Sequence, residues 1–153
     1  MLKDKIDFDR ICDIIPVWNW TELKVGLEKS LISHSEIISY AVRILSEEID
    51  QFDRVLELSI AEEDEVEEII FKLALDEGKK DLESVRSKWI FAIIYATYNY
   101  LNNEIYNVIE DVYVKFEYPQ EIKHLIGYMP CDDGRSMDVR LNEYIEINRN
   151  IWC

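Results

Sequence analysis

Apolar residues recur three and four positions apart along most of the chain, and this spacing constrains the fold more than any other feature. It is clearest in one row of side chains that share a helical face: Ile37, Ile38, Ala41, Ile44 and Leu45. Only 4 Gly and 3 Pro are present, too few for the many hairpins of a β-sandwich or barrel. No glycine-rich dinucleotide fingerprint occurs either. The sequence therefore predicts an all-α fold.

Local signals give the helix boundaries. Ser33 and Glu36 form a capping box, Ser136 can cap the last helix, and Pro16 and Gly78 are helix stops. A short helix is expected between Pro119 and Pro130. The predicted helices are 5–15, 21–29, 34–47, 51–60, 63–77, 82–101, 103–116, 119–127 and 137–150.

The segment 89–96 is apolar on every side, and a helix without a polar face must be surrounded by other helices. We expect one domain over residues 1–153, since 153 residues with 48% hydrophobic side chains suffice for one sizeable core. Its predicted architecture is an irregular antiparallel bundle, or a stack of helical hairpins, around the apolar helix near 82–101. Tyr95 and Tyr98 extend this helix and are expected in the core.

The sequence also predicts a cytoplasmic protein. Cys12, Cys131 and Cys153 form no CxxC pair and no even disulfide framework, which is typical of reduced thiols. The N-terminus lacks the apolar region of a secretory signal. The longest apolar stretch, residues 89–98, is about half of the roughly 20 residues that cross a bilayer.

Acidic charge is concentrated in one part of the chain. The net charge is −15, and residues 46–77 alone hold 13 acidic and 2 basic side chains. Such a charge repels phosphate backbones and anionic lipids, so neither nucleic acid nor a membrane is an expected partner. Six acids fall within seven positions at a predicted helix start: Glu62, Glu63, Asp64, Glu65, Glu67 and Glu68.

Two interpretations of these acids stay open. Negative charge at a helix N-terminus stabilises the helix, which favours a solvated acidic face. The helix dipole needs only one or two such acids, however, and like charges four positions apart repel each other. The excess favours a partner-binding patch formed by the six residues.

Candidate catalytic and metal-binding groups are sparse. Glu121 and His124 have the Glu-x-x-His spacing of di-iron bundles, but His34 is preceded by Leu31 at the same offset, so the second half of the motif is missing. The acidic run lacks the alternating oxygens and central glycine of a calcium-binding loop. Asp132, Asp133, Gly134 and Arg135 are explained as a polar turn. With no nucleophile paired with a base, we predict no enzyme, no catalytic or metal site and no cofactor.

Three stretches of the chain carry a resemblance to a known family. They are Trp18-Asn19-Trp20 with Leu23, Gly26, Leu27, Ile37, Ile38, Tyr40 and Ala41; Lys88-Trp89-Ile90-Phe91; and residues 116–124 with Tyr128, Met129 and Pro130. Together they resemble a small family of bacterial all-helical proteins of unknown function. Small acidic proteins of this kind are similar to the immunity proteins encoded beside polymorphic toxins, including LXG-type and contact-dependent systems. The resemblance implies a functional class but no functional site, because the residues that carry it specify architecture and none carries a reaction.

Three function hypotheses follow. The first is a cytosolic immunity protein that binds a basic toxin domain, often a nuclease, through the acidic residues 62–68. The alternative is a helical scaffold or adaptor without a toxin partner, and a neighbouring toxin reading frame would distinguish the two. The third is a metal-dependent enzyme that uses Glu121, His124 and the acidic helix, which metal analysis of the purified protein would test.

Overall fold

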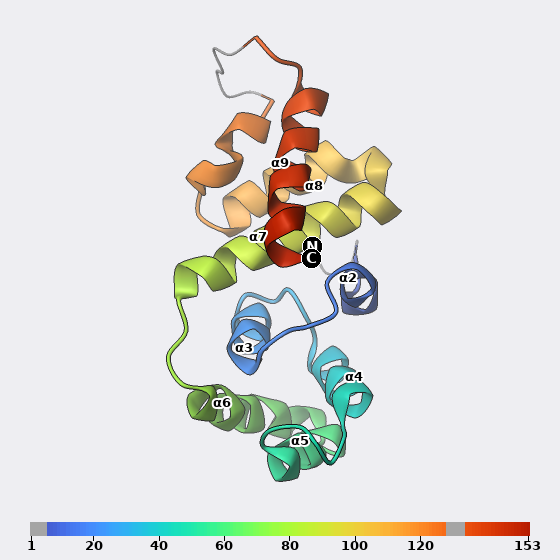
Figure 1. Cartoon of the computed structure of the whole chain (residues 1–153), viewed down its shortest axis with the longest axis vertical. Helices are drawn as coiled ribbons and strands as arrows, with labels where there is room; N and C mark the ends of the chain where they lie inside the picture. Colours follow the sequence, from blue (N-terminus) through green and yellow to red (C-terminus); the bar gives the residue numbers. More distant parts are fainter. Residues whose placement is uncertain (1–5, 128–133) are drawn as a thin grey trace. The chain divides into compact units, whose positions relative to one another are not determined.

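The computed structural model describes residues 6–127 and 134–153, and every regular element within these ranges is a helix (Figure 1). The all-α prediction is confirmed. The α-helices are α2 Phe8–Ile14, α3 Trp20–Glu28, α4 His34–Ile44, α5 Phe52–Ser59, α6 Val66–Glu77, α7 Leu82–Tyr100, α8 Ile105–Lys115 and α9 Met137–Trp152. Three 3₁₀ helices complete the described secondary structure: η1 Glu63–Glu65, η2 Asn102–Glu104 and η3 Gln120–Leu125.

Several predicted boundaries and helix types differ from the structure. The helix predicted at 119–127 is the 3₁₀ helix η3, and those predicted from 63 and 103 begin with the 3₁₀ turns η1 and η2 before α6 and α8 start. Short helical segments and first turns commonly take this tighter form. The helix predicted at 34–47 ends earlier, at Ile44, because Leu45 has extended backbone (φ −61°, ψ 121°).

The predicted capping signals are confirmed where the structure describes them. The Ser33 side chain accepts from the Glu36 N–H, and the Glu36 carboxylate accepts from the Ser33 N–H at 2.9 Å. Ser136 accepts from the Val139 N–H in the same way at the start of α9. Gly78 ends α6 with φ 88° and ψ −179°, a conformation essentially restricted to glycine. Pro130 lies outside the described residues.

The chain divides into two compact units (Figure 1). The terminal unit comprises Met1–Pro16 and Arg86–Cys153, and the middle unit comprises Val17–Val85. The terminal unit is therefore discontinuous in sequence, since its first helix, α2, precedes the whole middle unit. The expectation of a single domain over 1–153 stays a prediction.

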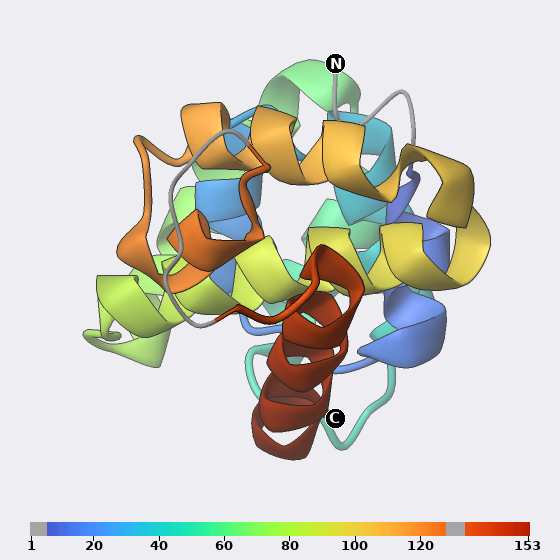
Figure 2. The same cartoon turned by 90° about the horizontal axis from the view of Figure 1, so that it is seen from above.

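The apolar part of α7 forms the core of the terminal unit. The side chains at 89–94 and at Ala96 are at most 4% exposed. The Trp89 ring lies 5.9 Å from the ring of Phe8 on α2, and the Phe91 ring meets Tyr144 of α9 edge-on at 6.1 Å. Figure 2 shows α9 crossing α7 in this unit. A helix without a polar face is thus buried, as the sequence predicted.

The prediction that Tyr95 and Tyr98 are core residues is wrong, because both are half-buried. Tyr95 stacks on Phe91 with the ring centroids 5.1 Å apart. The Tyr98 hydroxyl donates to Asn142 Oδ1 at 3.3 Å. A tyrosine that keeps its hydroxyl near the surface satisfies the oxygen without burying it.

In the middle unit, α6 packs against α3, α4 and α5. Its buried face consists of Val66, Ile69, Ile70, Leu73 and Ala74. The predicted apolar face of α4 is buried at Ile37 and Ala41 and half-buried at Ile38, Ile44 and Leu45.

Two polar side chains, Tyr40 and Glu77, fix the start of α3 in the middle unit. The Tyr40 hydroxyl donates to the Trp18 carbonyl at 2.9 Å and accepts from the Trp18 N–H at 3.1 Å. The Glu77 carboxylate, at the end of α6, accepts from the N–H groups of Trp20 and Thr21, both at 2.9 Å. These two N–H groups belong to the first turn of α3, where a helix leaves its donors unsatisfied and favours negative charge.

The longest helix, α7, carries charged residues in its first two turns. No helix in the described part of the chain combines the length and the apolar character needed to cross a bilayer.

Candidate functional site

The two units differ strongly in charge. The middle unit has 18 acidic and 7 basic side chains, a formal charge of −11, whereas the terminal unit has 14 and 10, a charge of −4. The middle unit therefore holds most of the negative charge of the molecule in less than half of its residues.

The six acids singled out by the sequence lie together at one end of α6. Glu62 precedes η1, which contains Glu63, Asp64 and Glu65, and Glu67 and Glu68 follow in the first turn of α6. All six side chains are exposed. We call this set of six residues the acidic cluster.

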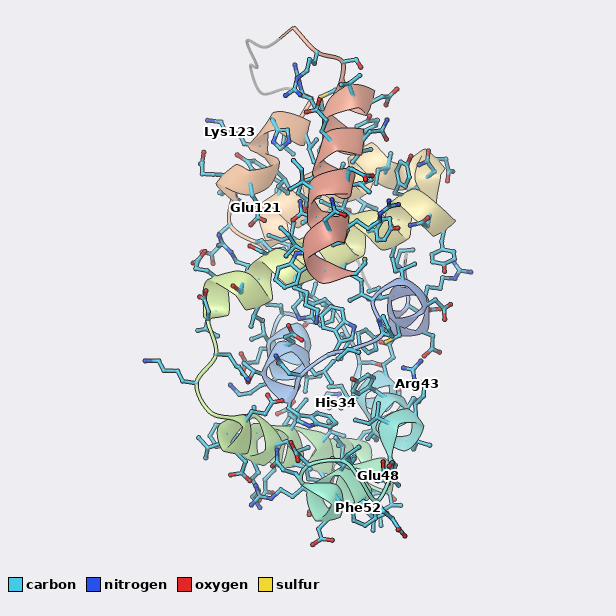
Figure 3. The ribbon with its side chains drawn as sticks, viewed as in Figure 1. His34, Arg43, Glu48, Phe52, Glu121 and Lys123 are labelled. Carbon is cyan, nitrogen blue, oxygen red and sulfur yellow. The ribbon has the colours of Figure 1, made fainter. Side chains whose placement is uncertain are left out.

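Three carboxylates of the acidic cluster have contacts within the middle unit. The Glu65 carboxylate accepts from the Glu62 N–H at 2.9 Å. Glu67 Oε1 lies 3.2 Å from Nε2 of His34, the first residue of α4, and His34 is labelled in Figure 3. Glu68 pairs with Lys72 one turn later at 3.3 Å. The solvated-face interpretation accounts for these three, since each supports local structure.

Glu63 and Asp64 are different. Within the described residues, neither side chain makes a hydrogen bond or an ion pair, and both are exposed on the short η1 turn. Two adjacent carboxylates held next to four others raise the local negative potential. The helix dipole favours negative charge at this end of α6, but repulsion among the neighbouring carboxylates opposes it.

An apolar groove lies along the C-terminal half of α6. It has a volume of about 680 Å³ and is lined by Thr21, Lys24, Phe71, Ala74, Leu75 and residues 78–83. We call it the α6 groove. A smaller adjoining pocket shares Lys24 and Phe71 with it and includes Glu67 of the acidic cluster.

The α6 groove exposes large apolar side chains. Phe71 is 53% exposed, Leu75 68% and Leu82 64%. The Lys24 ammonium lies 5.7 Å from the centroid of the Phe71 ring, with its charge also paired to Glu28 at 3.0 Å. Clustered exposed apolar residues with a charged rim are typical of interaction surfaces.

Sequence reasoning did not identify Phe71 and Leu75 as surface residues. The sequence does contain a signal for their exposure, because α6 has more apolar residues than one helical face can hold. The buried positions 66, 69, 70, 73 and 74 already complete an amphipathic pattern. Phe71 and Leu75 are left four apart on another face.

The Glu121 and His124 pair lies in the terminal unit on η3, where a spacing of three places both side chains on one side of a 3₁₀ helix (Figure 3 labels Glu121). Glu121 Oε1 accepts from the Ser87 hydroxyl at 3.2 Å. The His124 ring packs edge-on against Tyr144, with centroids 6.4 Å apart. Burial raises the pKa of the Tyr144 hydroxyl above its ordinary value, and the charge of Glu121 raises it further.

The described residues contain no group of three or more His, Cys, Asp or Glu side chains that could hold a metal ion. The proposed polar turn falls partly outside them, since Asp132 and Asp133 are not described. Arg135 forms an ion pair with Glu143 on α9. The Cys12 side chain is buried and the Cys153 side chain is exposed, and Cys131 lies outside the described residues.

Comparison with known proteins gives a family but no activity. The model of a family described as uncharacterized protein conserved in bacteria (DUF2247) matches residues 10–149, nearly the whole chain. No curated protein and no solved structure matches the chain significantly. The predicted resemblance to a bacterial all-helical family is thereby confirmed at the level of the family.

Proposed function

Because this chain belongs to the DUF2247 family, whose description assigns no activity, we propose its function from its own surface: it is an immunity protein. It binds and neutralises a basic toxin domain in the cytoplasm of the cell that makes both. The toxin domain is a nuclease in this proposal, since a domain that binds phosphate backbones carries the complementary positive charge.

The observation that carries the proposal is the acidic cluster. Glu63 and Asp64 are exposed carboxylates that make no hydrogen bond or ion pair within the described residues, and they belong to a unit with a formal charge of −11. Exposed carboxylates can occupy the positions on a nuclease surface that would otherwise bind phosphates. Inhibition would then be steric, with long-range attraction making association fast.

Growth rescue tests the proposal directly. The toxin domain encoded beside this gene is produced in a bacterial host with and without this protein. Restored growth with the protein, together with a purified one-to-one complex, supports the proposal. Failure to form a complex with the neighbouring toxin domain contradicts it, as does the absence of any toxin reading frame beside the gene, which favours the adaptor hypothesis.

Association kinetics then test the role of the acidic cluster. We expect Glu63→Lys with Asp64→Lys to slow association by about ten-fold or more at low salt, and to flatten its dependence on salt. The matched control is Glu110→Lys with Glu117→Lys, which changes the net charge equally on exposed residues of the terminal unit. Stopped-flow rates at several salt concentrations give the comparison. If both double variants slow association equally, net charge and not the acidic cluster determines the rate.

A further inference from the structure

One row of residues on α6 changes character in a regular order. Glu67, Phe71 and Leu75 are spaced by four, so they lie on one side of the helix and span about 12 Å of its axis. Glu67 is exposed, and Phe71 and Leu75 are more than half exposed. Beyond the end of α6, the exposed Lys79 and Lys80 line the same groove. The row from Glu67 to Lys80 therefore runs acidic, apolar, apolar, basic. Asp81 and Glu83 also line the groove after these lysines, and with Lys24 the groove lining has three basic and two acidic side chains.

Two copies of this row are complementary in charge when they run in opposite directions. If a second row lies antiparallel to the first, Glu67 meets Lys79 and Lys80, and Phe71 meets Leu75. A parallel arrangement would instead place Glu67 against Glu67 and lysine against lysine. Only the antiparallel arrangement satisfies both ends of the row, and it is generated by a two-fold axis.

We propose that the α6 groove binds a second copy of this chain in a symmetric antiparallel dimer, with the two-fold axis passing between Phe71 and Leu75. In such an interface each contact occurs twice, once on either side of the axis. Leu82, which lines the groove and is 64% exposed, widens the apolar surface available to the second copy. The dimer goes beyond the proposed immunity function. It shares Glu67 with the acidic cluster, whereas Glu63 and Asp64 stay outside this row.

Charge sets the conditions for dimer formation. Each copy has a net charge of −15, so two copies repel each other at low salt. At physiological ionic strength the Debye length is about 8 Å, which screens this long-range repulsion more than the contacts inside the interface. Sedimentation equilibrium of the wild-type chain is therefore performed at that ionic strength, and we expect a reversible monomer–dimer equilibrium.

A charge exchange tests the antiparallel arrangement. Glu67→Lys alone places like charges at both ends of the dimer, and so does Lys79→Glu combined with Lys80→Glu. Each variant alone should dimerise about ten-fold more weakly than the wild type. An equimolar mixture should recover wild-type affinity to within about three-fold, because in the mixed dimer both ends again pair opposite charges.

The mixture also controls for effects within one copy. Glu67→Lys removes the contact to His34, and mixing cannot restore a contact inside a single copy. Recovery in the mixture therefore reports pairing between copies. A mixture that dimerises no more tightly than the separate variants overturns the antiparallel arrangement.

Leu75→Ser tests the apolar part of the interface, with Ile147→Ser on α9 as a matched control of similar exposure, 61% against 68%. Both variants should keep wild-type helix content in circular dichroism. Leu75→Ser should weaken dimerisation by about ten-fold or more, and Ile147→Ser should leave it unchanged. A wild-type chain that stays monomeric at all accessible concentrations, or equal weakening by the two variants, overturns the proposal.

Discussion

Helices α7 and α6 are both rich in apolar residues, yet they use them in opposite ways. In the terminal unit, α7 buries the side chains at 89–94 to at most 4% exposure. In the middle unit, α6 buries one face and leaves Phe71 and Leu75 on the surface. Apolar content alone therefore does not measure how much a helix contributes to a core. We expect α7 to act mainly in stability and α6 mainly in recognition.

The largest expected effect comes from removing a large aromatic side chain from each helix. Trp89 is 0% exposed and its ring lies 5.9 Å from that of Phe8, so Trp89→Ala should lower the free energy of unfolding by about 3–5 kcal/mol. Phe71 is 53% exposed, and Phe71→Ala should change it by only about 0.5 kcal/mol. Urea unfolding at low protein concentration measures both. Equal losses in the free energy of unfolding would contradict the different roles expected for α7 and α6.

A smaller loss of stability is expected from replacing Glu77, whose carboxylate caps the first turn of α3 in the middle unit. Glu77→Ala removes the acceptor of two first-turn N–H groups and should cost about 1–3 kcal/mol. Glu57→Ala on α5 removes an exposed carboxylate from the same unit and serves as the control. A loss no larger than that of the control would show that water replaces Glu77 without cost.

The smallest expected effect is on how the free energy of unfolding depends on pH, through Tyr106 in the terminal unit. Burial, helped by the Asp138 carboxylate that accepts from its hydroxyl, raises the pKa of Tyr106 from 10.0 to about 12. Below pH 10 the hydroxyl is protonated in both the folded and the unfolded chain. Between pH 10 and 12 the unfolded chain loses this proton while folded Tyr106 keeps it, so the stability due to this group falls as pH rises.

Tyr106→Phe should therefore lose less stability than the wild type between pH 10 and 12, in thermal melts at a series of pH values. Tyr118→Phe is the control, since Tyr118 is 59% exposed. Parallel pH curves for wild type and Tyr106→Phe would contradict a raised pKa.

Much of the fold could be predicted because its signals are local. The capping box at Ser33, the cap at Ser136 and the stop at Gly78 depend on residues only a few positions apart. The burial of α7 followed from a segment with no polar face. These features are independent of how the helices are arranged.

The remaining features depend on residues far apart in the sequence. Nothing near Glu77 indicates that its carboxylate caps a helix that begins 57 residues earlier. The half-burial of Tyr95 and Tyr98 depends on how α9 crosses α7. For the acidic cluster, the sequence pattern identified all six residues. It could not separate the four that have contacts in the middle unit, Glu62, Glu65, Glu67 and Glu68, from Glu63 and Asp64.

The discontinuity of the terminal unit has a consequence for the order in which the ribosome delivers its parts. Phe8 is made early, but its aromatic neighbour Trp89 follows 81 residues later. At about 5–20 residues per second, this delay lasts roughly 4–16 seconds. During that interval the uninterrupted middle unit, residues 17–85, is synthesised in full. Phe8 on α2 therefore meets Trp89 only after the middle unit has been made. We expect the exposed acids Asp7, Asp9 and Asp13 in and beside α2 to oppose aggregation of this segment during that interval.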